Sequence, residues 1–501
     1  MCAGIEGKMP NYIIGLDQST QGTKALLFNY LGELVKRVDK PHRQIVDAVG
    51  FVEHDPEEIY QNAISVIKQL IISAGIEKSE ITAIGITNQR ETTVAFHPDG
   101  TPVYPAIVWQ CARAQYICDK IAAAGYSKQI KEVTGLELSP YFSAAKMAWI
   151  LENVPNANYL LQNGDLRIGT MDTYLIYRLT KGKSYVTDCS NASRTQLMNL
   201  KTLSWDIAMC DIFQIPITSL PSIQASDSFF GETDFDDFLP KPIPIHAVLG
   251  DSQGALFGQG CRKEGTVKVT YGTGSSVMVN AGKSPVKTGN GIVTSVGWKI
   301  NEEVTYVIEG NINYAGAVIT WMKDDLRLFD TVSQCEELVN SASPKDTVYL
   351  VPAFTGLGAP YWDSEAKGMI CGMTRNTRRE EIIRAGLDCI AYQIHDVLES
   401  IIKSTGIQAK ELRADGGATK NKYLMQFQSN ITAMPLYIAE TEELSGLGVA
   451  YLAGMKTKLY RQDITELMNY HKYEAQMPKE EVYKKLSGWR EALNLVIGPR
   501  H

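Results

Sequence analysis

A carboxylate at a predicted strand-to-helix corner is the first candidate for chemistry in this sequence. Asp251 follows Gly250 and an apolar run at 245–249 that is typical of a buried strand, and residues 254–258 fit the first turn of a helix. Such a corner presents its polar residue at the carboxyl end of a sheet, where α/β proteins bind ligands. Because Asp is also a preferred helix N-cap, a purely structural role for Asp251 stays open at this point.

Two predicted hairpins carry small polar residues at the turn, where a phosphate could bind. The first pairs strands at 12–17 and 24–28, and the second pairs strands at 267–271 and 275–280 around Gly272, Thr273 and Gly274. A third small-residue turn lies at 415–418. Such turns let backbone N–H groups approach phosphate oxygens. The sequence has no GxxxxGK[ST] motif and no protein-kinase glycine loop with an HRD segment, so ATP would need another cradle.

Asp17, at the end of the first strand, is a candidate for a metal site beside the first turn. Mg²⁺ usually keeps several waters and takes few carboxylates, which suits a metal–water–phosphate contact there. Lys24, on the returning strand, could be a charge partner of Asp17 or a solvated strand residue.

The elements that must position these residues alternate between strand and helix. The hydrophobic spacing predicts helices at 57–73, 146–151, 170–180, 380–403 and 445–454, strands at 81–86 and 348–351, a turn at 203–206, and connecting loops with edge strands at 216–244. The strand at 81–86 delivers a polar loop at 87–92. We expect two α/β domains, residues 1–255 and 256–501, that face each other across a cleft.

Composition excludes several classes of protein. A length of 501 residues predicts two to four domains, and the formal net charge of −7, without a basic run, argues against a nucleic-acid partner. Nine cysteines without zinc-site spacing indicate reduced thiols and a cytoplasmic protein. No apolar run approaches the ~18 residues of a membrane span, and residues 1–8 do not resemble a signal peptide.

Taken together, these motifs resemble the FGGY carbohydrate kinases, and within that family its glycerol kinase branch. Matching stretches occur in family order between about residues 11 and 495, namely 16–20, 84–93, 106–111, 139–146, 191–195, 250–251, 271–274, 354–362, 415–418 and 446–454. The resemblance implies an α/β fold of two actin-like (ribonuclease H-like) domains flanking a catalytic cleft. It also implies ATP and Mg²⁺, and phosphorylation of a terminal hydroxyl of glycerol or a closely related polyol or sugar.

The resemblance assigns roles residue by residue. Asp251 matches the general base that takes the proton from the attacking hydroxyl. The substrate-binding positions match Arg90, Glu91, Trp109, Tyr141, Asp251, Ser252 and Ser276; the nucleotide positions match Thr20, Gln21, Lys24, Gly272, Thr273, Gly316, Thr320, Gly417, Ala418 and Asn421; the metal positions match Asp17 and Asp251. Taken alone, Arg90 and Glu91 could be a surface ion pair, the aromatic residues could be core, and Asn421 could be a helix cap.

Three departures from the family pattern bear on the substrate and on regulation. Ser252 stands where glycerol kinases carry Gln, and Ser276 where they carry Phe. Both positions line the polyol pocket in the family, so a wider and more polar pocket is expected. A glycine-rich, arginine-containing loop that binds a sugar bisphosphate in some of these kinases is replaced by Asp234, Asp236 and Asp237.

Two alternatives stay open beside a glycerol-type kinase. One is a kinase for a four- or five-carbon polyol or ketose, such as erythritol, ribulose or xylulose. The other, from a different class, is an actin-like ATPase switch without a small-molecule substrate; such a switch would not need Arg90, Glu91, Trp109 and Asp251 together. The expected partners are ATP and the small substrate, with neither nucleic acid nor a membrane span, and the resemblance implies a homo-oligomer, dimer or tetramer.

Overall fold

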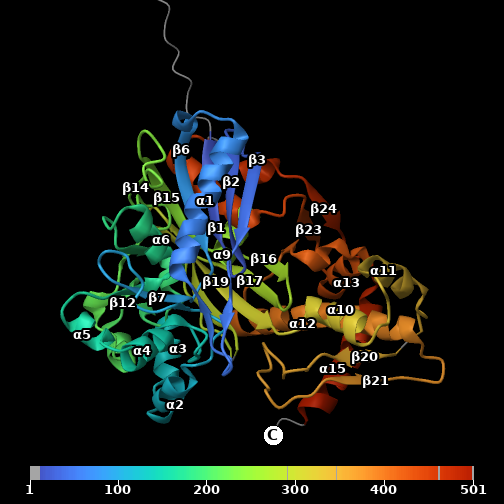
Figure 1. Cartoon of the computed structure of the whole chain (residues 1–501). Helices are drawn as coiled ribbons and strands as arrows, with labels where there is room; N and C mark the ends of the chain where they lie inside the picture. Colours follow the sequence, from blue (N-terminus) through green and yellow to red (C-terminus); the bar gives the residue numbers. More distant parts are fainter. Residues whose placement is uncertain (1–11, 290, 346, 461–462, 499–501) are drawn as a thin grey trace, which may run out of the picture.

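The computed structural model describes residues 12–289, 291–345, 347–460 and 463–498. The segment at 1–8, which the sequence does not identify as a signal peptide, lies outside the described residues. The described residues form two central sheets, one from each half of the chain, with helices around and between them (Figure 1).

The sheet of the N-terminal half has six strands in the order β14-β15-β6-β1-β2-β3. Strand β1 pairs antiparallel with β2, β2 pairs antiparallel with β3, and β1, β6 and β15 run parallel. The strands are β1 (Tyr12–Gln18), β2 (Gly22–Asn29), β3 (Leu34–Pro41), β6 (Ile81–Asn88), β14 (Glu232–Thr233) and β15 (Ile243–Gly250).

The sheet of the C-terminal half repeats this arrangement in the order β18-β19-β17-β16-β22-β23-β24. Strands β16, β17 and β19 are antiparallel, and β16, β22 and β23 are parallel, so they correspond to β1, β2, β3, β6 and β15. The strands are β16 (Thr266–Tyr271), β17 (Ser275–Gly282), β18 (Val293–Ile300), β19 (Glu303–Ile312), β22 (Glu411–Asp415), β23 (Leu436–Ala439) and β24 (Tyr470–Tyr473). Both predicted hairpins, β1–β2 and β16–β17, are present.

Both faces of the N-terminal sheet are buried along its central strands β1, β6 and β15, which explains the apolar runs in these strands. Ile14 and Leu16 face helix α1 (Pro56–Ala74), whose buried stripe includes Ile59, Ala63 and Ile67. Ile13, at the alternate position, faces a second core that the C-terminal half shares. Because successive side chains of a strand point to opposite faces, β1 contributes to two separate cores, one on each side of the sheet.

Helices α9 (Asp251–Gly258) and α14 (Leu444–Lys456) contribute a large part of that shared core, which also takes in Trp298 and Val307 from the C-terminal sheet. Their backbones approach so closely that a Cβ on Gly448 would lie 2.0 Å from the Gly254 carbonyl oxygen. The small residues of α14 thus allow the tight packing that its composition predicts. Figure 1 shows α9 at the centre, between the strands of the two sheets.

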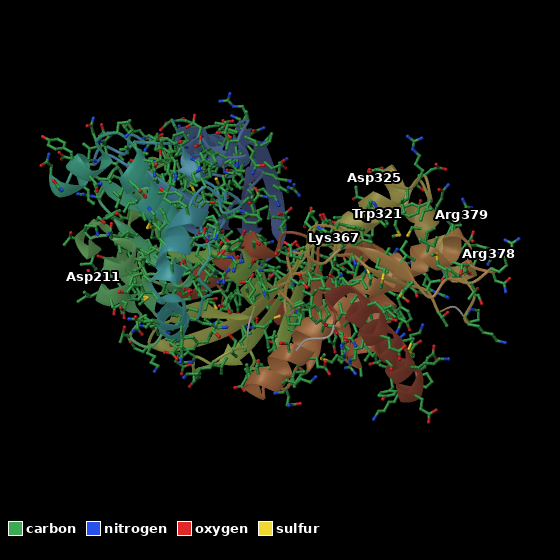
Figure 2. The ribbon with its side chains drawn as sticks, turned by 90° about the horizontal axis from the view of Figure 1, so that it is seen from below. Asp211, Trp321, Asp325, Lys367, Arg378 and Arg379 are labelled. Carbon is green, nitrogen blue, oxygen red and sulfur yellow. The ribbon has the colours of Figure 1, made fainter. Side chains whose placement is uncertain are left out.

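The remaining elements surround these layers. In the N-terminal half they are β4 (Ile45–Val46), β5 (Val52–His54), β7 (Thr93–Phe96), β8 (Ala106–Ile107), α2 (Gln115–Ala123), α3 (Ser127–Thr134), α4 (Ser143–Asn153), α5 (Ala157–Gln162), β9 (Arg167–Thr170), α6 (Met171–Leu179), β10 (Val186–Asp188), α7 (Cys189–Ala192), β11 (Met198–Asn199), β12 (Ser204–Trp205), α8 (Ile207–Phe213) and β13 (Ser222–Gln224). In the C-terminal half they are α10 (Gly316–Thr320), α11 (Val332–Ser341), β20 (Tyr349–Val351), β21 (Met369–Cys371), α12 (Arg379–Thr405), α13 (Lys422–Thr432) and α15 (Lys479–Ile497). Seen from below, Asp211 lies on the outer side of the N-terminal half and Arg378 and Arg379 on the outer side of the C-terminal half (Figure 2).

Several local predictions need correction, and one stays open. Helix α9 begins at Asp251 rather than near residue 254, and Gly250 is its N-cap, so the N-cap hypothesis for Asp251 is wrong. Residues 203–206 hold strand β12 as well as a turn, and α4 begins at Ser143, before the predicted start at 146. The proposed domain boundary at 255 falls inside α9 and stays a prediction.

Among the described residues, none of the helices combines the length and the apolar composition that a bilayer crossing requires.

Candidate active site

Strand β6 ends in a buried loop that carries Arg90 and Glu91. Their exposed fractions are 6% and 2%, so they do not form a surface ion pair. Glu91 has a φ of 61°, in the left-handed region that non-glycine residues seldom adopt. Strained backbone of this kind persists where surrounding contacts impose it, and it is frequent at functional sites.

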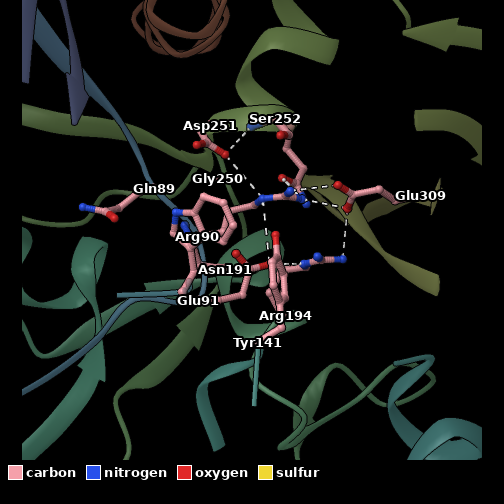
Figure 3. A network of polar contacts seen from close by, with 12 residues as sticks. Gln89, Arg90, Glu91, Tyr141, Asn191, Arg194, Gly250, Asp251, Ser252 and Glu309 are labelled. Carbon is pink, nitrogen blue, oxygen red and sulfur yellow. Dashed lines mark hydrogen bonds and ion pairs between the residues drawn. The ribbon is translucent and has the colours of Figure 1, made fainter. Parts of the chain in front are cut away.

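The Arg90 guanidinium links this loop to Asp251 and to the C-terminal sheet. Its Nε atom lies 3.3 Å from Asp251 Oδ1. Its Nη1 and Nη2 atoms donate to the two oxygens of Glu309 on β19, at 3.0 and 2.9 Å. Figure 3 shows this fork-to-fork pair beside Asp251. Burial by itself would lower the pKa of Arg90, but Glu309 and Glu91 keep it well above its usual value.

A second buried arginine completes the network. Arg194 Nε donates to Glu91 Oε1 at 2.5 Å, and its Nη1 lies 3.0 Å from Glu309 Oε2. The Ser276 hydroxyl donates to Glu309 Oε1 at 3.0 Å. Arg194 lies in a stretch that matches the family pattern, but no role was predicted for it, and Glu309 was not predicted. A glutamate on a strand that is otherwise mostly apolar was the signal that could have found Glu309.

Asp251 stands at the edge of this network with part of its carboxylate accessible. Its side chain is 34% exposed, whereas that of Arg90 is 6% exposed. The backbone N–H of Ser252 donates to Asp251 Oδ1 at 2.6 Å, and the Gly250 N–H donates to Ser190 Oγ at 2.9 Å. These bonds fix the corner while the carboxylate stays open to a ligand.

Two aromatic rings stand beside these charges. The ring centroids of Trp109 and Tyr141 are 5.5 Å apart in an edge-to-face arrangement. The indole N–H of Trp109 donates to Thr20 Oγ1 at 2.9 Å. Burial raises the pKa of the Tyr141 hydroxyl, and the Glu91 carboxylate adds to that effect. The ammonium of Lys146 donates to the carbonyl oxygens of residues 140, 141 and 142, which holds the segment that carries Tyr141.

The predicted nucleotide residues of the C-terminal half lie around the β16–β17 turn. The Gly316 N–H donates to the Gly272 carbonyl at 2.9 Å, and the N–H groups of Ala315 and Ala317 donate to the Thr273 carbonyl. Gly416 has a φ of 98°, and a Cβ there would lie 2.4 Å from the Tyr271 carbonyl oxygen. The turn at 415–418 therefore lies against the hairpin, with Gly417 open on its Cβ side.

The other predicted nucleotide residues have local partners. Asn421 is the N-cap of α13 and accepts from the Leu424 N–H, as the helix-cap alternative expects. Thr320 is exposed at the end of α10, and its hydroxyl bonds to the Gly316 carbonyl. Ala418 is half-buried in the short 3₁₀ turn at 417–420, and Gln21 is exposed at the tip of the first hairpin. Lys24 donates to Glu443 at 3.1 Å and lies 3.8 Å from Asp17, so it is not simply a solvated strand residue.

Asp17 fits a cation site because one of its carboxylate oxygens is buried without a partner. Its Oδ1 atom is buried and has no hydrogen-bond partner. Burial raises the pKa of Asp17 to about 7; Lys24 opposes this effect, while the Asp251 and Glu443 carboxylates add to it. A divalent cation held by Asp17 would supply the missing partner. No group of three or more metal-ligating side chains occurs in the described ranges.

The three carboxylates that replace the bisphosphate-binding loop of the family pattern have partners. Lys181 Nζ lies 2.9 Å from Asp234 and 2.8 Å from Asp237, and the Tyr60 hydroxyl donates to Asp236. The loop therefore presents paired charges, which weakens the expectation that three free carboxylates would repel an anion.

Comparison with known proteins identifies the family. Models of the N-terminal and C-terminal domains of the FGGY family of carbohydrate kinases match residues 12–258 and 267–457. The chain belongs to this family. It is 45% identical to glycerol kinase 1 of Thermotoga maritima over 97% of this chain and 99% of the relative, and 43% identical to the glycerol kinase of Bacillus licheniformis with the same coverage.

Solved structures agree with this FGGY assignment. The crystal structure of Plasmodium falciparum glycerol kinase with ADP superposes with a TM-score of 0.92 and 35% identity, covering 98% of this chain and 99% of that one. The sequence-based identification of the family, of the two-domain kinase fold and of a phosphotransferase with an alcohol acceptor is confirmed.

Proposed function

We propose that this FGGY kinase transfers the γ-phosphoryl group of ATP to a terminal hydroxyl of glycerol. The observation that carries the proposal is the partly exposed Asp251 carboxylate beside the buried pair Arg90 and Glu91, in a chain whose relatives are glycerol kinases. A cation and carboxylates side by side can donate to and accept from the neighbouring hydroxyls of a polyol.

Asp251 is the proposed general base. Phosphoryl transfer passes through a loose transition state, so the protein mainly positions the reactants and stabilises charge. Arg90 and Glu91 would orient the polyol, Trp109 and Tyr141 would cover it and exclude water, and Asp251 would accept the proton of the attacking hydroxyl. Thr20, Gln21, Lys24, Gly272 and Thr273 would hold the phosphates. Gly316, Thr320, Gly417, Ala418 and Asn421 would hold the rest of the nucleotide.

Mg²⁺ is proposed with Asp17 and Asp251 as its protein ligands. The unpartnered Oδ1 atom of Asp17 and its raised pKa support this assignment. When bound, the ion neutralises phosphate charge. Since Lys24 lies 3.8 Å from Asp17, it would also balance the charge of that carboxylate.

A longer substrate stays a second candidate because Ser252 and Ser276 are smaller than the residues of the family pattern. The contact between Ser276 and Glu309 weakens this candidate, since that hydroxyl already has a partner. Membership of a carbohydrate kinase family sets aside the actin-like switch.

The remaining proposals concern the setting of the reaction. We propose two domains divided near residue 255, a cytoplasmic location in keeping with eight free cysteines among the described residues, and a homo-oligomer.

ADP release with a panel of three- to six-carbon polyols and ketoses tests the function. The rate should depend on added polyol, and glycerol should give the highest kcat/KM. ADP release that is independent of every polyol would overturn the proposal, and a better four- or five-carbon substrate would replace glycerol in it.

A further inference from the structure

Glu309 is a fully buried carboxylate that three other side chains contact, those of Arg90, Arg194 and Ser276. Oε1 accepts from Arg90 Nη2 and from the Ser276 hydroxyl, at 2.9 and 3.0 Å. Oε2 accepts from Arg90 Nη1 and lies at ion-pair distance from Arg194 Nη1, both at 3.0 Å. A carboxylate has about four lone-pair sites. Three of these sites accept hydrogen bonds, and the side chain has no exposed surface, so Glu309 does not bind a substrate hydroxyl, although it holds residues that do face the proposed substrate.

The contacts of Glu309 join the two halves of the chain. Glu309 lies on β19 of the C-terminal sheet, whereas Arg90 and Arg194 lie in the N-terminal half. Figure 3 shows the two guanidinium groups converging on Glu309 while Arg90 also reaches toward Asp251. Bidentate pairing fixes the plane of a guanidinium as well as its position. The C-terminal sheet thus determines how Arg90 presents its Nε–H edge to Asp251.

Charge balance points the same way. Burial by itself would raise the pKa of Glu309, but Arg90 and Arg194 outweigh it and hold the pKa well below its usual range. The two buried arginines are matched by two buried glutamates, Glu91 and Glu309. Without the Glu309 charge, Asp251 and Glu91 would be the remaining nearby carboxylates for Arg90, and a closer pair with Asp251 would occupy the oxygen that must accept a proton.

We propose that Glu309 is a positioning residue for the acceptor site, and that the Ser276 hydroxyl holds Glu309 in place rather than binding the substrate. The inference rests on the proposed function, because it takes the acceptor to be a polyol bound beside Arg90. It applies to this chain in particular, since the phenylalanine of the family pattern at position 276 could not donate a hydrogen bond to Glu309.

Kinetics of Glu309→Gln and Ser276→Ala test the proposal. Glu309→Gln keeps the shape of the side chain but removes its charge, and we expect KM for glycerol to rise at least tenfold, kcat to fall at least tenfold, and KM for ATP to change less than threefold. Ser276→Ala removes one of the four contacts, and we expect a two- to tenfold rise in KM for glycerol with KM for ATP unchanged. A purely structural defect would instead change both KM values or the amount of folded enzyme.

Two control variants come from the same sheet. Glu303→Gln removes an exposed carboxylate from β19 that pairs with Lys283, and Ser295→Ala removes a buried hydroxyl on β18 that has no hydrogen-bond partner. Neither should change KM for glycerol or kcat. Thermal unfolding and ADP affinity establish that each variant is folded.

The possible outcomes are distinct. If Glu309→Gln does not fold, Ser276→Ala decides, because loss of a single hydrogen bond is tolerated. A folded Glu309→Gln or Ser276→Ala variant with wild-type KM for glycerol and wild-type kcat would overturn the inference while the proposed function stands. A wild-type enzyme without polyol-dependent ADP release would overturn the proposed function, and this inference with it.

Discussion

The indole N–H of Trp109 donates to the hydroxyl of Thr20 at 2.9 Å, which joins the aromatic wall of the proposed acceptor site to the turn of the first hairpin. Trp109 also packs edge-to-face on Tyr141, so one side chain contacts both the wall and the turn. The two substrates of the proposed reaction would therefore bind to groups that are already in contact before either substrate arrives.

Replacing Trp109 with Phe keeps a ring but removes the N–H donor. A neutral hydrogen bond contributes about 0.5–1.5 kcal/mol, so kcat/KM should fall roughly two- to tenfold for both ATP and glycerol. Steady-state kinetics with each substrate varied in turn measure the two effects. An effect on glycerol alone would contradict the coupling between wall and turn.

Asp251→Asn should abolish phosphoryl transfer and leave substrate binding intact. A well-placed general base contributes typically 10²–10⁴-fold, and kcat should fall within that range. Binding of ADP and of glycerol, measured by calorimetry, should stay within about threefold of wild type, a small change beside that fall. A variant that keeps more than about a tenth of kcat would exclude Asp251 as the base.

The ligand-free protein should become more stable in the Asp17→Asn variant, most clearly at alkaline pH. Burial raises the pKa of Asp17 to about 7 from its usual value of 3.8, so folding favours the protonated carboxyl. That contribution is complete below pH 3.8 and is lost as the pH rises through 7, which leaves a cost of at most roughly 4 kcal/mol at pH 8.

Thermal unfolding at pH 4.5 and at pH 8 measures the Asp17 effect. The gain in Tm from Asp17→Asn should be several degrees larger at pH 8 than at pH 4.5, whereas the exposed Asp211→Asn control should behave alike at both. Mg²⁺ should stabilise the wild type in the presence of ADP and should not stabilise Asp17→Asn. An equal gain at both pH values would contradict the raised pKa.

Local patterns in the sequence predicted the positions where a polar residue ends a strand. Asp17, Arg90 and Asp251 follow apolar runs, and each does lie at or just beyond the end of a parallel strand. Glu309 could not be found in this way, because its importance comes from Arg90 and Arg194, which are more than a hundred positions away. A strand that alternates between its two faces does not reveal which partners lie opposite a buried carboxylate.

Helix α14 illustrates the same limit at the level of the fold. Its small residues predicted tight packing, but the residues that it packs against belong to α9 and to the N-terminal sheet. The boundary at residue 255 was predicted from the repeated hairpins. It does not reflect that α14, late in the chain, packs against α9 and the N-terminal sheet. The features that could not be predicted from the sequence depend on contacts between distant segments rather than on local propensity.

Fructose 1,6-bisphosphate should not inhibit the enzyme. Lys181, which lies beside the loop, already pairs with Asp234 and Asp237, so it has no free charge to offer a phosphate. The rate of ADP release with glycerol should be unchanged at millimolar bisphosphate. Inhibition that disappears when Asp234 or Lys181 is replaced would show that the loop binds the effector after all.

Restoring the family pattern at the two departed positions should narrow the range of acceptors. Ser252→Gln with Ser276→Phe returns a long amide and a ring to the pocket, and the ring costs the hydrogen bond to Glu309. Activity with every polyol should therefore fall, but kcat/KM for glycerol relative to erythritol and xylitol should rise about tenfold, or roughly 1.4 kcal/mol of differential binding in the transition state.

The general loss of activity cancels in this ratio of kcat/KM values. The control Ser276→Ala loses the hydrogen bond without adding a ring, so it should leave the ratio unchanged. Values of kcat/KM for glycerol, erythritol and xylitol on the wild type, the double variant and Ser276→Ala decide the matter. A ratio that moves equally in Ser276→Ala and in the double variant would mean that the hydroxyl, not the volume of the pocket, selects the substrate.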